Sequence, residues 1–533
     1  MATLEGQTIA GSYKDLLQVS NSNSGVDATA RAVSDGEGTA TLLYVSTTEV
    51  YNPGTGGTSN TAFGKNAGDA LTTNGNYNVV IGEEAGTALT TGVNNVVVGY
   101  NALYRGTTES DDNVAIGYNA MSGNFTTAVV NDVVAIGSGA LAGTLTADAT
   151  GTTVIGTAAG AAITSGIGNV AIGFQALDAE DDGDRNTAVG YNALTAQNAS
   201  AGTVGNTAVG YSAGAGLTDA THFTGVGSLA GGGATLTGIG NTVVGYATGT
   251  SLTGGAENTA VGKYSLLNAT SGANNVAVGS SAMQEVLGGG RNVAIGVNAL
   301  KVLTAGGTDA NLGNIAIGYG ALDSLQTGES NIAIGVAAMD ATTGAVSNCV
   351  IIGERAGDAI NSTDSDGTVA IGYYAASANV SGIGNVVVGY QALLAADQAD
   401  ACTAIGHQSL SDVTIDNDGH HTFVGYQSGR GVVSGSQNTG FGSKVMGDSS
   451  KTISGSNNVA VGYQVMQNAT GDVNSNIGMG TNSLDALTAG DDNIAIGQDS
   501  AQLLTTGVKN VAIGTGAFDR ASLGEEGNVA IGY

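Results

Sequence analysis

A short apolar block that ends in glycine recurs along most of this chain. Its form is clear at residues 113–121, 186–194 and 292–300, which read NVAIGYNAM, NTAVGYNAL and NVAIGVNAL. The glycine occurs 27 times, from Gly64 to Gly532, and the 26 intervals are 17 to 22 residues long, thirteen of them 17. A fixed minimum with occasional longer intervals predicts a coil of constant size, with loops inserted on one side.

Each position of the repeat has its own composition. With the glycine as position 0, position −4 is Asn in 20 of 27 copies, positions −3 to −1 are mostly Val, Thr or Ile around a central Ala or Val, and position +1 is Tyr in 11 copies. Position +3 is Ala in 18 of 26 copies, and position +4 is usually Leu, Met or Gly. A short β-branched block, closed by turns such as Thr-Thr-Gly at 90–92, predicts a strand in every copy.

Side-chain alternation gives this strand two unlike faces. Positions −3, −1 and +1 place Val, Ile and Tyr on one face, and positions −4, −2 and 0 place Asn, Ala and Gly on the other. A strand without a charged face is usually covered on both sides. We therefore expect the bulky face to fill the interior of the coil, and the small face to lie against another wall or another chain.

Three recurring residues have expected structural roles. The Asn amides at position −4 can donate and accept hydrogen bonds between stacked coils, which predicts a ladder. The glycine at position 0 suits a positive φ or a close backbone approach. Tyr at position +1 predicts an aromatic stack, with a binding stripe as the alternative.

These features predict an all-β fold, a parallel β-solenoid or β-roll of about 27 coils. At about 4.8 Å per coil, such a stack is a rod of roughly 130 Å. A two-strand coil of 17 residues is thin. Threefold association would cover its small-residue face, which predicts a homotrimer.

The first part of the chain lacks the repeat. We assign residues 1–52 to an N-terminal attachment or adaptor segment, 53–59 to a glycine-rich linker with Pro53, the single proline, and 60–533 to the repetitive shaft. Within the first segment, the pattern predicts a short helix or strand over 12–19, turns over 20–25 and 35–38, and a strand over 39–50.

Composition and charge exclude several classes of protein. Collagen needs regular glycine and abundant proline, whereas this chain has 89 Gly and 1 Pro. Lys plus Arg number 14 against 44 Asp plus Glu, a net charge of −30, so neither nucleic acid nor an anionic membrane is an expected partner. Residues 1–17 contain Glu5 and no apolar core of signal-peptide length, so we expect no secretory signal there. No apolar run is long enough to predict a membrane span. Assembly into a virus particle, with release by lysis, would still place it outside a cell.

Cysteines and histidines offer few candidates for chemistry. Cys349 and Cys402 occupy position −4 three coils apart, roughly 14 Å, which predicts two unpaired buried side chains. The histidines are His222, His407 and the pair His420 and His421, of which His421 takes the Asn position. On a threefold axis this pair could hold a metal, and a place in the ladder is the alternative.

Acidic clusters lie between coils at Glu109–Asp112, Glu180–Asp184 and Asp491–Asp492. They lack the spacing of known calcium loops, so solvated loops are expected, with calcium as the alternative. No nucleophile elbow or catalytic triad can be assigned. The sequence therefore predicts no enzyme, no catalytic or metal residue, and no cofactor.

Two families resemble parts of this chain. The blocks NVAIGYNAM and NTAVGYSAG are similar to the repeats in the heads of trimeric autotransporter adhesins over about 470 residues, although those heads mostly repeat at a shorter period. That resemblance implies a left-handed parallel β-roll trimer. Because the repeats of this sequence run to Tyr533 without a coiled-coil stalk or membrane anchor, we do not expect an autotransporter itself. Residues 12–50 resemble the start of bacteriophage tail-fibre and appendage proteins, marine ones included.

Together these features predict a structural fibre protein of a bacteriophage particle, located in the virion and used for host-surface attachment. Its expected partners are further copies of itself, other virion proteins through the N-terminal segment, and a host receptor or glycan. The alternatives are a bacterial cell-surface adhesin, a self-assembling extracellular filament protein, and a polysaccharide depolymerase. Because Tyr533 stops inside a repeat, we expect a longer natural chain, a covering partner or end-to-end joining.

Overall fold

The structure is a computed structural model. It describes residues 57–533 except 106–108, 125–128, 147–148, 199–201, 234, 305–311, 415–418 and 522, and the backbone of four short strands before them. The chain divides into two compact units, Met1–Thr253 and Gly254–Tyr533, each described below by itself.

The four early strands form one antiparallel sheet in the order β1 (Gln18–Val19), β2 (Arg31–Ser34), β3 (Ala40–Val45) and β4 (Val50–Tyr51). The predicted single strand over 39–50 is wrong, because β3 and β4 are two strands that pair antiparallel with each other. The turns predicted over 20–25 and 35–38 lie outside the described residues.

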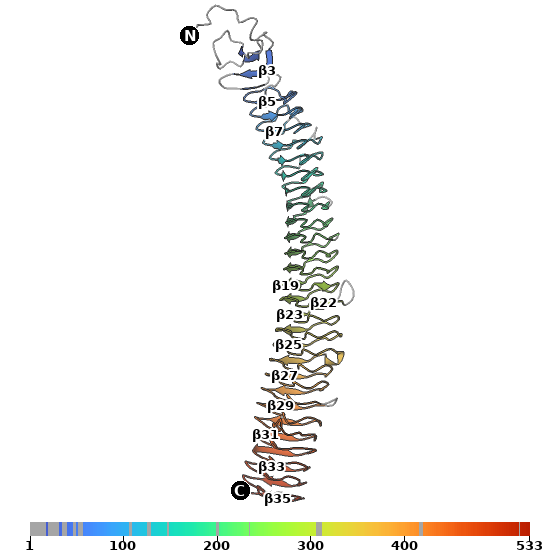
Figure 1. Cartoon of the computed structure of the whole chain (residues 1–533), viewed down its shortest axis with the longest axis vertical. Coiled ribbons are helices and arrows are strands. Elements are labelled where there is room, and N and C mark those ends of the chain that lie inside the picture. Colours follow the sequence, from blue (N-terminus) through green and yellow to red (C-terminus); the bar gives the residue numbers. More distant parts are fainter. Residues whose placement is uncertain are drawn as a thin grey trace, which may run out of the picture. The chain divides into compact units, whose positions relative to one another are not determined.

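The rest of the first unit is a stack of 11 coils, each with one three-residue strand (Figure 1). Each strand covers positions −3 to −1, and neighbouring strands pair in parallel with equivalent positions opposite each other. The strands are β5 (Thr61–Phe63), β6 (Val79–Ile81), β7 (Val96–Val98), β8 (Val114–Ile116), β9 (Val134–Ile136), β10 (Thr153–Ile155), β11 (Val170–Ile172), β13 (Thr187–Val189), β15 (Thr207–Val209), β16 (Thr224–Val226) and β17 (Thr242–Val244).

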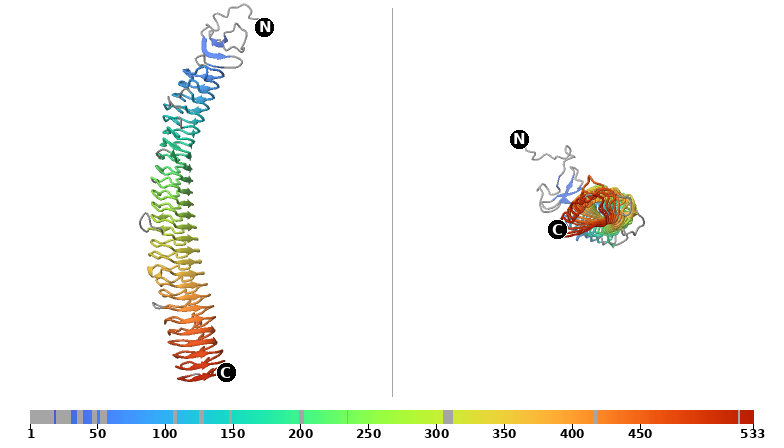
Figure 2. Two further views of the ribbon diagram at one scale, coloured as in Figure 1. Left: turned by 180° about the vertical axis from the view of Figure 1, so that it is seen from behind. Right: turned by 90° about the horizontal axis from the view of Figure 1, so that it is seen from below.

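The second unit stacks 16 coils in the same way. Figure 2 shows the strands of each unit following one another along one side of its stack. These strands are β18 (Thr259–Val261), β19 (Val276–Val278), β21 (Val293–Ile295), β23 (Ile315–Ile317), β24 (Ile332–Ile334), β25 (Val350–Ile352), β26 (Val369–Ile371), β27 (Val386–Val388), β28 (Thr403–Ile405), β29 (Thr422–Val424), β30 (Thr439–Phe441), β31 (Val459–Tyr463), β32 (Ile477–Thr481), β33 (Ile494–Ile496), β34 (Val511–Ile513) and β35 (Val529–Ile531).

The prediction of an all-β parallel solenoid is therefore confirmed. Among the described residues, the helical content is one turn of 3-10 helix, η1 (Thr363–Ser365). A second strand appears in only a few described coils, as the parallel pairs β12 (Gly183–Asp184) with β14 (Gly202–Thr203) and β20 (Glu285–Val286) with β22 (Val302–Leu303). The expectation of two strands in every coil is wrong, because turns of the backbone build most of each coil.

Backbone hydrogen bonds join the coils well beyond the strands. The Gly99 N–H donates to the Ile81 carbonyl at 2.8 Å, and two residues later the Asn101 N–H donates to Glu83 at 3.2 Å. The Gly86 N–H donates to Ala102 of the next coil at 2.9 Å. The backbone of the turns is thus hydrogen-bonded between coils as the backbone of the strands is. These bonds satisfy backbone N–H and C=O groups that are buried in the stack.

The glycine at position 0 combines both roles expected of it. The φ of these 27 glycines lies between 129° and 143°. At Gly296 an added Cβ would overlap the carbonyl oxygen of Gly318 in the next coil, and repeat glycines that have a following coil, such as Gly64 and Gly514, meet the same obstacle. The residue must be glycine for its conformation and for the closeness of the neighbouring coil.

The expected orientation of the strand is wrong, because the small face lies inside and the bulky face outside. In the coil of Gly296, Asn292 and Ala294 are fully buried, whereas Ile295 is 40% exposed. Position −2 is buried in almost every described strand, and positions −3 and −1 are half-buried or exposed. The interior is completed by positions +3 and +4, here Ala299 and Leu300, both fully buried.

The narrow interior of the coil explains this orientation. The Leu, Met or Gly at position +4 faces the residue at position −2, so both cannot be large. Where position −2 is Phe423, position +4 is Gly429, at which an added Cβ would lie 2.6 Å from the ring. Gly440, at position −2 of the next coil, also leaves room for that ring. A strand that turned Val, Ile and Tyr inward would overfill this space.

Candidate functional site: the exposed strand face

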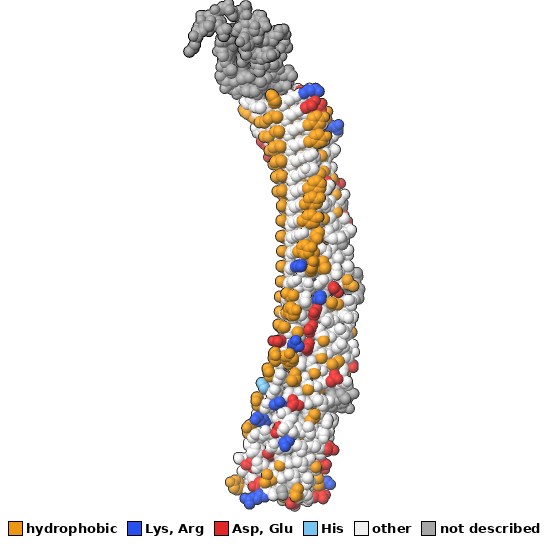
Figure 3. Space-filling model, in the orientation of Figure 1, with side chains coloured by type: hydrophobic (Ala, Val, Ile, Leu, Met, Phe, Trp, Pro, Cys, Tyr) orange, Lys and Arg blue, Asp and Glu red, His pale blue; other side chains and the backbone are white. Residues whose placement is uncertain are grey.

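The exposed side of the strands is an apolar face that carries almost no charge. All 54 residues at positions −3 and −1 are Val, Ile, Thr, Phe or Met, although the chain contains 58 charged residues, 44 acidic and 14 basic. At position +1 the charged residues are Lys65, Glu83, Lys263 and Glu354. We call positions −3, −1 and +1 of successive coils the strand face. Figure 3 shows apolar side chains in columns along the coils of the first unit.

Position +1 forms an aromatic column at the edge of the strand face. In the first unit, Tyr191 stacks between Phe174 and Tyr211, with ring centroids 5.0 and 5.6 Å apart. In the second unit, Tyr373 stacks on Tyr390 at 5.3 Å. The predicted aromatic stack is confirmed, and the rings remain 40–55% exposed along their outer edges.

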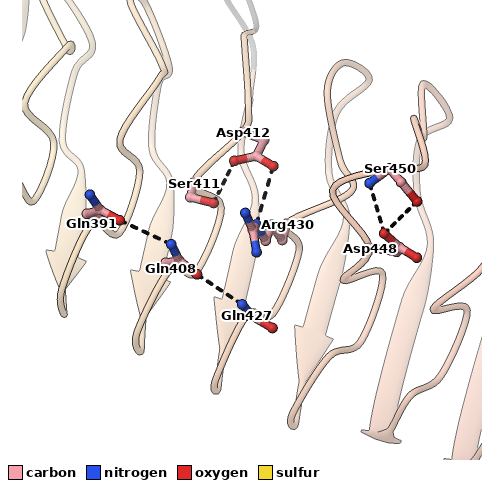
Figure 4. Close-up of polar contacts among 8 residues, drawn as sticks. All are labelled: Gln391, Gln408, Ser411, Asp412, Gln427, Arg430, Asp448 and Ser450. Atoms are coloured by element: carbon pink, nitrogen blue, oxygen red, sulfur yellow. Dashed lines mark hydrogen bonds and ion pairs between the residues drawn. The ribbon is translucent and has the colours of Figure 1, made fainter.

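His407 belongs to this aromatic column. Its ring lies between Tyr390 at 4.9 Å and Tyr426 at 5.3 Å. A parallel column of amides flanks it at position +2, where Gln408 donates to Gln391 at 3.1 Å and Gln427 donates to Gln408 at 2.9 Å (Figure 4). Ring and amide contacts therefore order the edge of the strand face along the stack.

The predicted Asn ladder is present inside the coils. The Oδ1 atom of Asn275 accepts from the backbone N–H and from Nδ2 of Asn292, at 3.0 and 3.1 Å. Its own Nδ2 donates to the carbonyl of Gly289 at 3.1 Å. Each amide thus joins two coils, and its burial assigns it a structural role rather than contact with a ligand.

Both cysteines and His421 occupy places in this ladder. Cys349 and Cys402 are free and fully buried, as expected, and burial raises the pKa of each thiol to about 11. His421 is fully buried, and its Nδ1 accepts from the backbone N–H of Asn438 at 3.2 Å. Burial lowers the pKa of His421 to about 4. The ladder alternative for His421 is confirmed.

Several predicted acidic residues take part in contacts between coils. Asp111 accepts from the backbone N–H of Val93, and Asp491 from that of Asn474, both at 2.8 Å. These contacts form a second ladder at position −6, which the sequence reading missed. The signal was available, because Asn76, Asn131 and Asn474 stand at the same position.

One acidic group could hold a metal ion. Among the described residues, Glu180, Asp181 and Asp182 form the one cluster whose ligand atoms lie within 4.8 Å of one another. Glu180 is fully buried and accepts from the N–H of Gly183 at 2.7 Å. The described histidines contribute to no such cluster, and calcium binding at Glu180, Asp181 and Asp182 stays the untested alternative to a solvated loop.

No protein-family model, curated protein or solved structure matches this chain. The described part of the chain contains no helix with the length and hydrophobicity needed to cross a bilayer.

Proposed function

We propose that this protein is a structural fibre component of a bacteriophage particle, with a shaft made of further copies of the chain packed strand face to strand face as a homotrimer. One observation carries this proposal, namely the apolar, nearly charge-free strand face that every described coil presents to solvent. Parallel sheets are normally covered on both faces, and here one face is open.

The size of the strand face favours a stable partner. If each coil offers on the order of 100 Å² of apolar area, the 16 coils of the second unit offer about 1,600 Å² per chain. Divided between the two neighbours in a trimer, this is roughly 800 Å² per partner, the size of a standard interface. Apolar patches larger than a few hundred Å² mark interaction sites on soluble proteins.

A second copy of the chain fits this face better than an unrelated protein. A partner must present an uncharged surface with the same repeat along the stack, and the chain itself has one. The net charge of −30 opposes association through the other surfaces, where the acidic residues lie. A cyclic trimer closes the contact without leaving a face open.

The assembly is tested by the native mass of the full chain. We expect a trimer, and we expect the double variant Ile295→Lys/Ile405→Lys to dissociate it because two charges per copy would be buried. The matched control is Leu287→Lys/Leu503→Lys, since both leucines are about half exposed but lie off the strand face. A monomeric wild-type chain, or equal masses for the two double variants, would contradict the proposal.

The place of the protein is tested separately. We expect mass spectrometry to find the chain in purified virus particles from its source, with its gene beside virion structural genes. Recovery with cell envelopes, beside secretion genes, would favour the adhesin. Shortening of host polysaccharide by the purified protein would favour the depolymerase.

A further inference from the structure

Self-association through the strand face leaves the register of the copies unspecified. Successive coils present nearly the same residues, so a slip of one coil, about 4.8 Å, replaces each contact with a similar one. The following inference rests on the proposed function and concerns what prevents such slips.

The column at position −1 contains a few residues that break its regularity. In the second unit it is Val or Ile in all coils except two, where it is Phe441 and Met479. These side chains are 45% and 39% exposed. Phe441 pairs in the sheet with Val424 and Val461, so a single large ring stands out between two small neighbours.

The same two coils are small at position +1. Phe441 is followed by Ser443, and Met479 by Thr481. On either side of Ser443 the aromatic column continues with Tyr426 and Tyr463, which are 48% and 47% exposed. A large residue at position −1 thus coincides with a gap in the column at position +1.

We propose that Phe441 of one copy seats on Ser443 of the adjacent copy, with Met479 on Thr481 as a second contact, and that this fit fixes the copies in register. This contact requires the column at position −1 of each copy to meet the column at position +1 of the next, which the heterologous interface of a cyclic trimer allows. At equal height the ring of Phe441 fills the gap at Ser443. After a slip of one coil, it meets Tyr426 or Tyr463, and the two aromatic side chains compete for one space.

Filling the gap tests the contact. Ser443→Tyr should weaken the assembly about tenfold. The new tyrosine and Phe441 of the adjacent copy would then compete for one space, and the cost of such overpacking is roughly the 1.4 kcal/mol that corresponds to a tenfold change in affinity. Ser280→Tyr is the control, since its coil carries Val278 at position −1. Phe441→Ile/Ser443→Tyr should restore the assembly, because Ile371 and Tyr373 already combine in this way. Native mass at serial dilutions measures each variant.

The register itself is measured between spin labels. Labels are attached to a cysteine at Leu287 in some copies and at Leu503 in the others, because both side chains are about half exposed off the strand face and both natural cysteines are fully buried. Between copies these two labels are separated mainly along the stack, so a slip of one coil changes their distance by about 4.8 Å. We expect one narrow distance in the wild type and several distances, separated by coil steps, in Phe441→Ile/Met479→Ile. Ile371→Val/Ile496→Val should keep the single distance.

The outcomes separate the two proposals. A monomeric wild-type chain contradicts the proposed assembly and the register contact with it. An intact assembly in which Ser443→Tyr behaves like Ser280→Tyr, or in which Phe441→Ile/Met479→Ile keeps one narrow distance, overturns the register contact alone.

Discussion

Three positions besides the repeat glycine have left-handed backbone in every complete coil, and in most coils they hold residues other than glycine. They are positions −5, +2 and +4, represented in one coil by Arg291, Asn298 and Leu300, with φ of 62°, 59° and 45°. No Val, Ile or Thr occupies any of these positions, although the three types fill position −3. The steric cost of a branched Cβ at positive φ explains this exclusion. The sequence held this signal, but only the glycine at position 0 was interpreted as a residue with positive φ.

Leu300→Ile should therefore destabilise the protein more than a leucine-to-isoleucine change usually does in a protein core. Leucine and isoleucine have equal volume, so the change isolates the backbone conformation, and we expect a loss of about 2 kcal/mol. Leu303→Ile in β22 of the same coil is the control, because Leu303 is also fully buried but lies in a strand. Urea unfolding compares them, and equal midpoints would reject the explanation.

His421 should make stability depend on pH between about 4 and 6.5. The folded pKa of about 4 lies below the unfolded value of 6.5, so within this range the unfolded chain binds a proton that the folded chain does not. Stability therefore falls as the pH drops, by about 2 kcal/mol at pH 5 relative to pH 8.

The variant His421→Asn isolates this effect, because Asn is the usual ladder residue and does not titrate. We expect its melting temperature to fall less than that of the wild type between pH 8 and pH 5. The carboxylates contribute equally to the pH dependence of both proteins. An equal fall in melting temperature for the wild type and for His421→Asn would therefore show that His421 is not the titrating group.

At the scale of the element, the sequence predicted the coil better than its orientation. The spacing of the glycines, the Asn ladder and the strand at positions −3 to −1 follow from repetition alone. Orientation did not follow, because the residues at positions −3 and −1 and those at positions +3 and +4 are both apolar. Only the width of the coil decides between them, as Phe423 and Gly429 show. The second ladder at position −6 was not predicted, because aspartates such as Asp111 and Asp491 lie in acidic clusters, which are typical of solvated loops.

The Asn ladder should contribute strongly to the stability of each coil. Asn275→Ala removes the acceptor for the buried N–H of Asn292 and the donor for the Gly289 carbonyl. Buried groups left without partners cost about 1–3 kcal/mol each, so we expect a loss of about 3 kcal/mol.

Asn275→Thr should restore part of this loss. Thr152 takes the same place in another coil, where its hydroxyl donates to Gly166 at 3.1 Å and accepts from the N–H of Asn169 at 3.4 Å. Urea unfolding ranks the variants, and equal losses for alanine and threonine would show that the hydrogen bonds matter less than the filled space.

At the scale of the whole chain, the charges missing from the strand face are concentrated on the remaining surface. Asp323, Asp340 and Asp358 share position +5 in three successive coils. Burial raises the pKa of all three carboxyls, and repulsion from Asp340 raises those of Asp323 and Asp358 further. A folded pKa above the unfolded value means that stability falls as the pH rises through this range. This column therefore destabilises the fold at neutral pH.

Salt should raise the melting temperature of this protein, because it screens repulsion among 44 acidic residues. We expect the melting temperature to rise between about 10 and 150 mM NaCl. Asp340→Asn should show a smaller rise, because it should already melt at a higher temperature at low salt. Asp364→Asn, at an exposed aspartate away from the column, should behave like the wild type.

The same measurement decides the calcium hypothesis. If Glu180, Asp181 and Asp182 bind calcium in the folded state, calcium at matched ionic strength must raise the melting temperature beyond the effect of NaCl, since a ligand of the folded state stabilises it by mass action. Glu180→Gln should then lose that increment while keeping the response to NaCl. Equal melting temperatures in calcium and in EDTA at one ionic strength would leave screening as the whole effect, and the cluster as an ordinary part of an acidic surface.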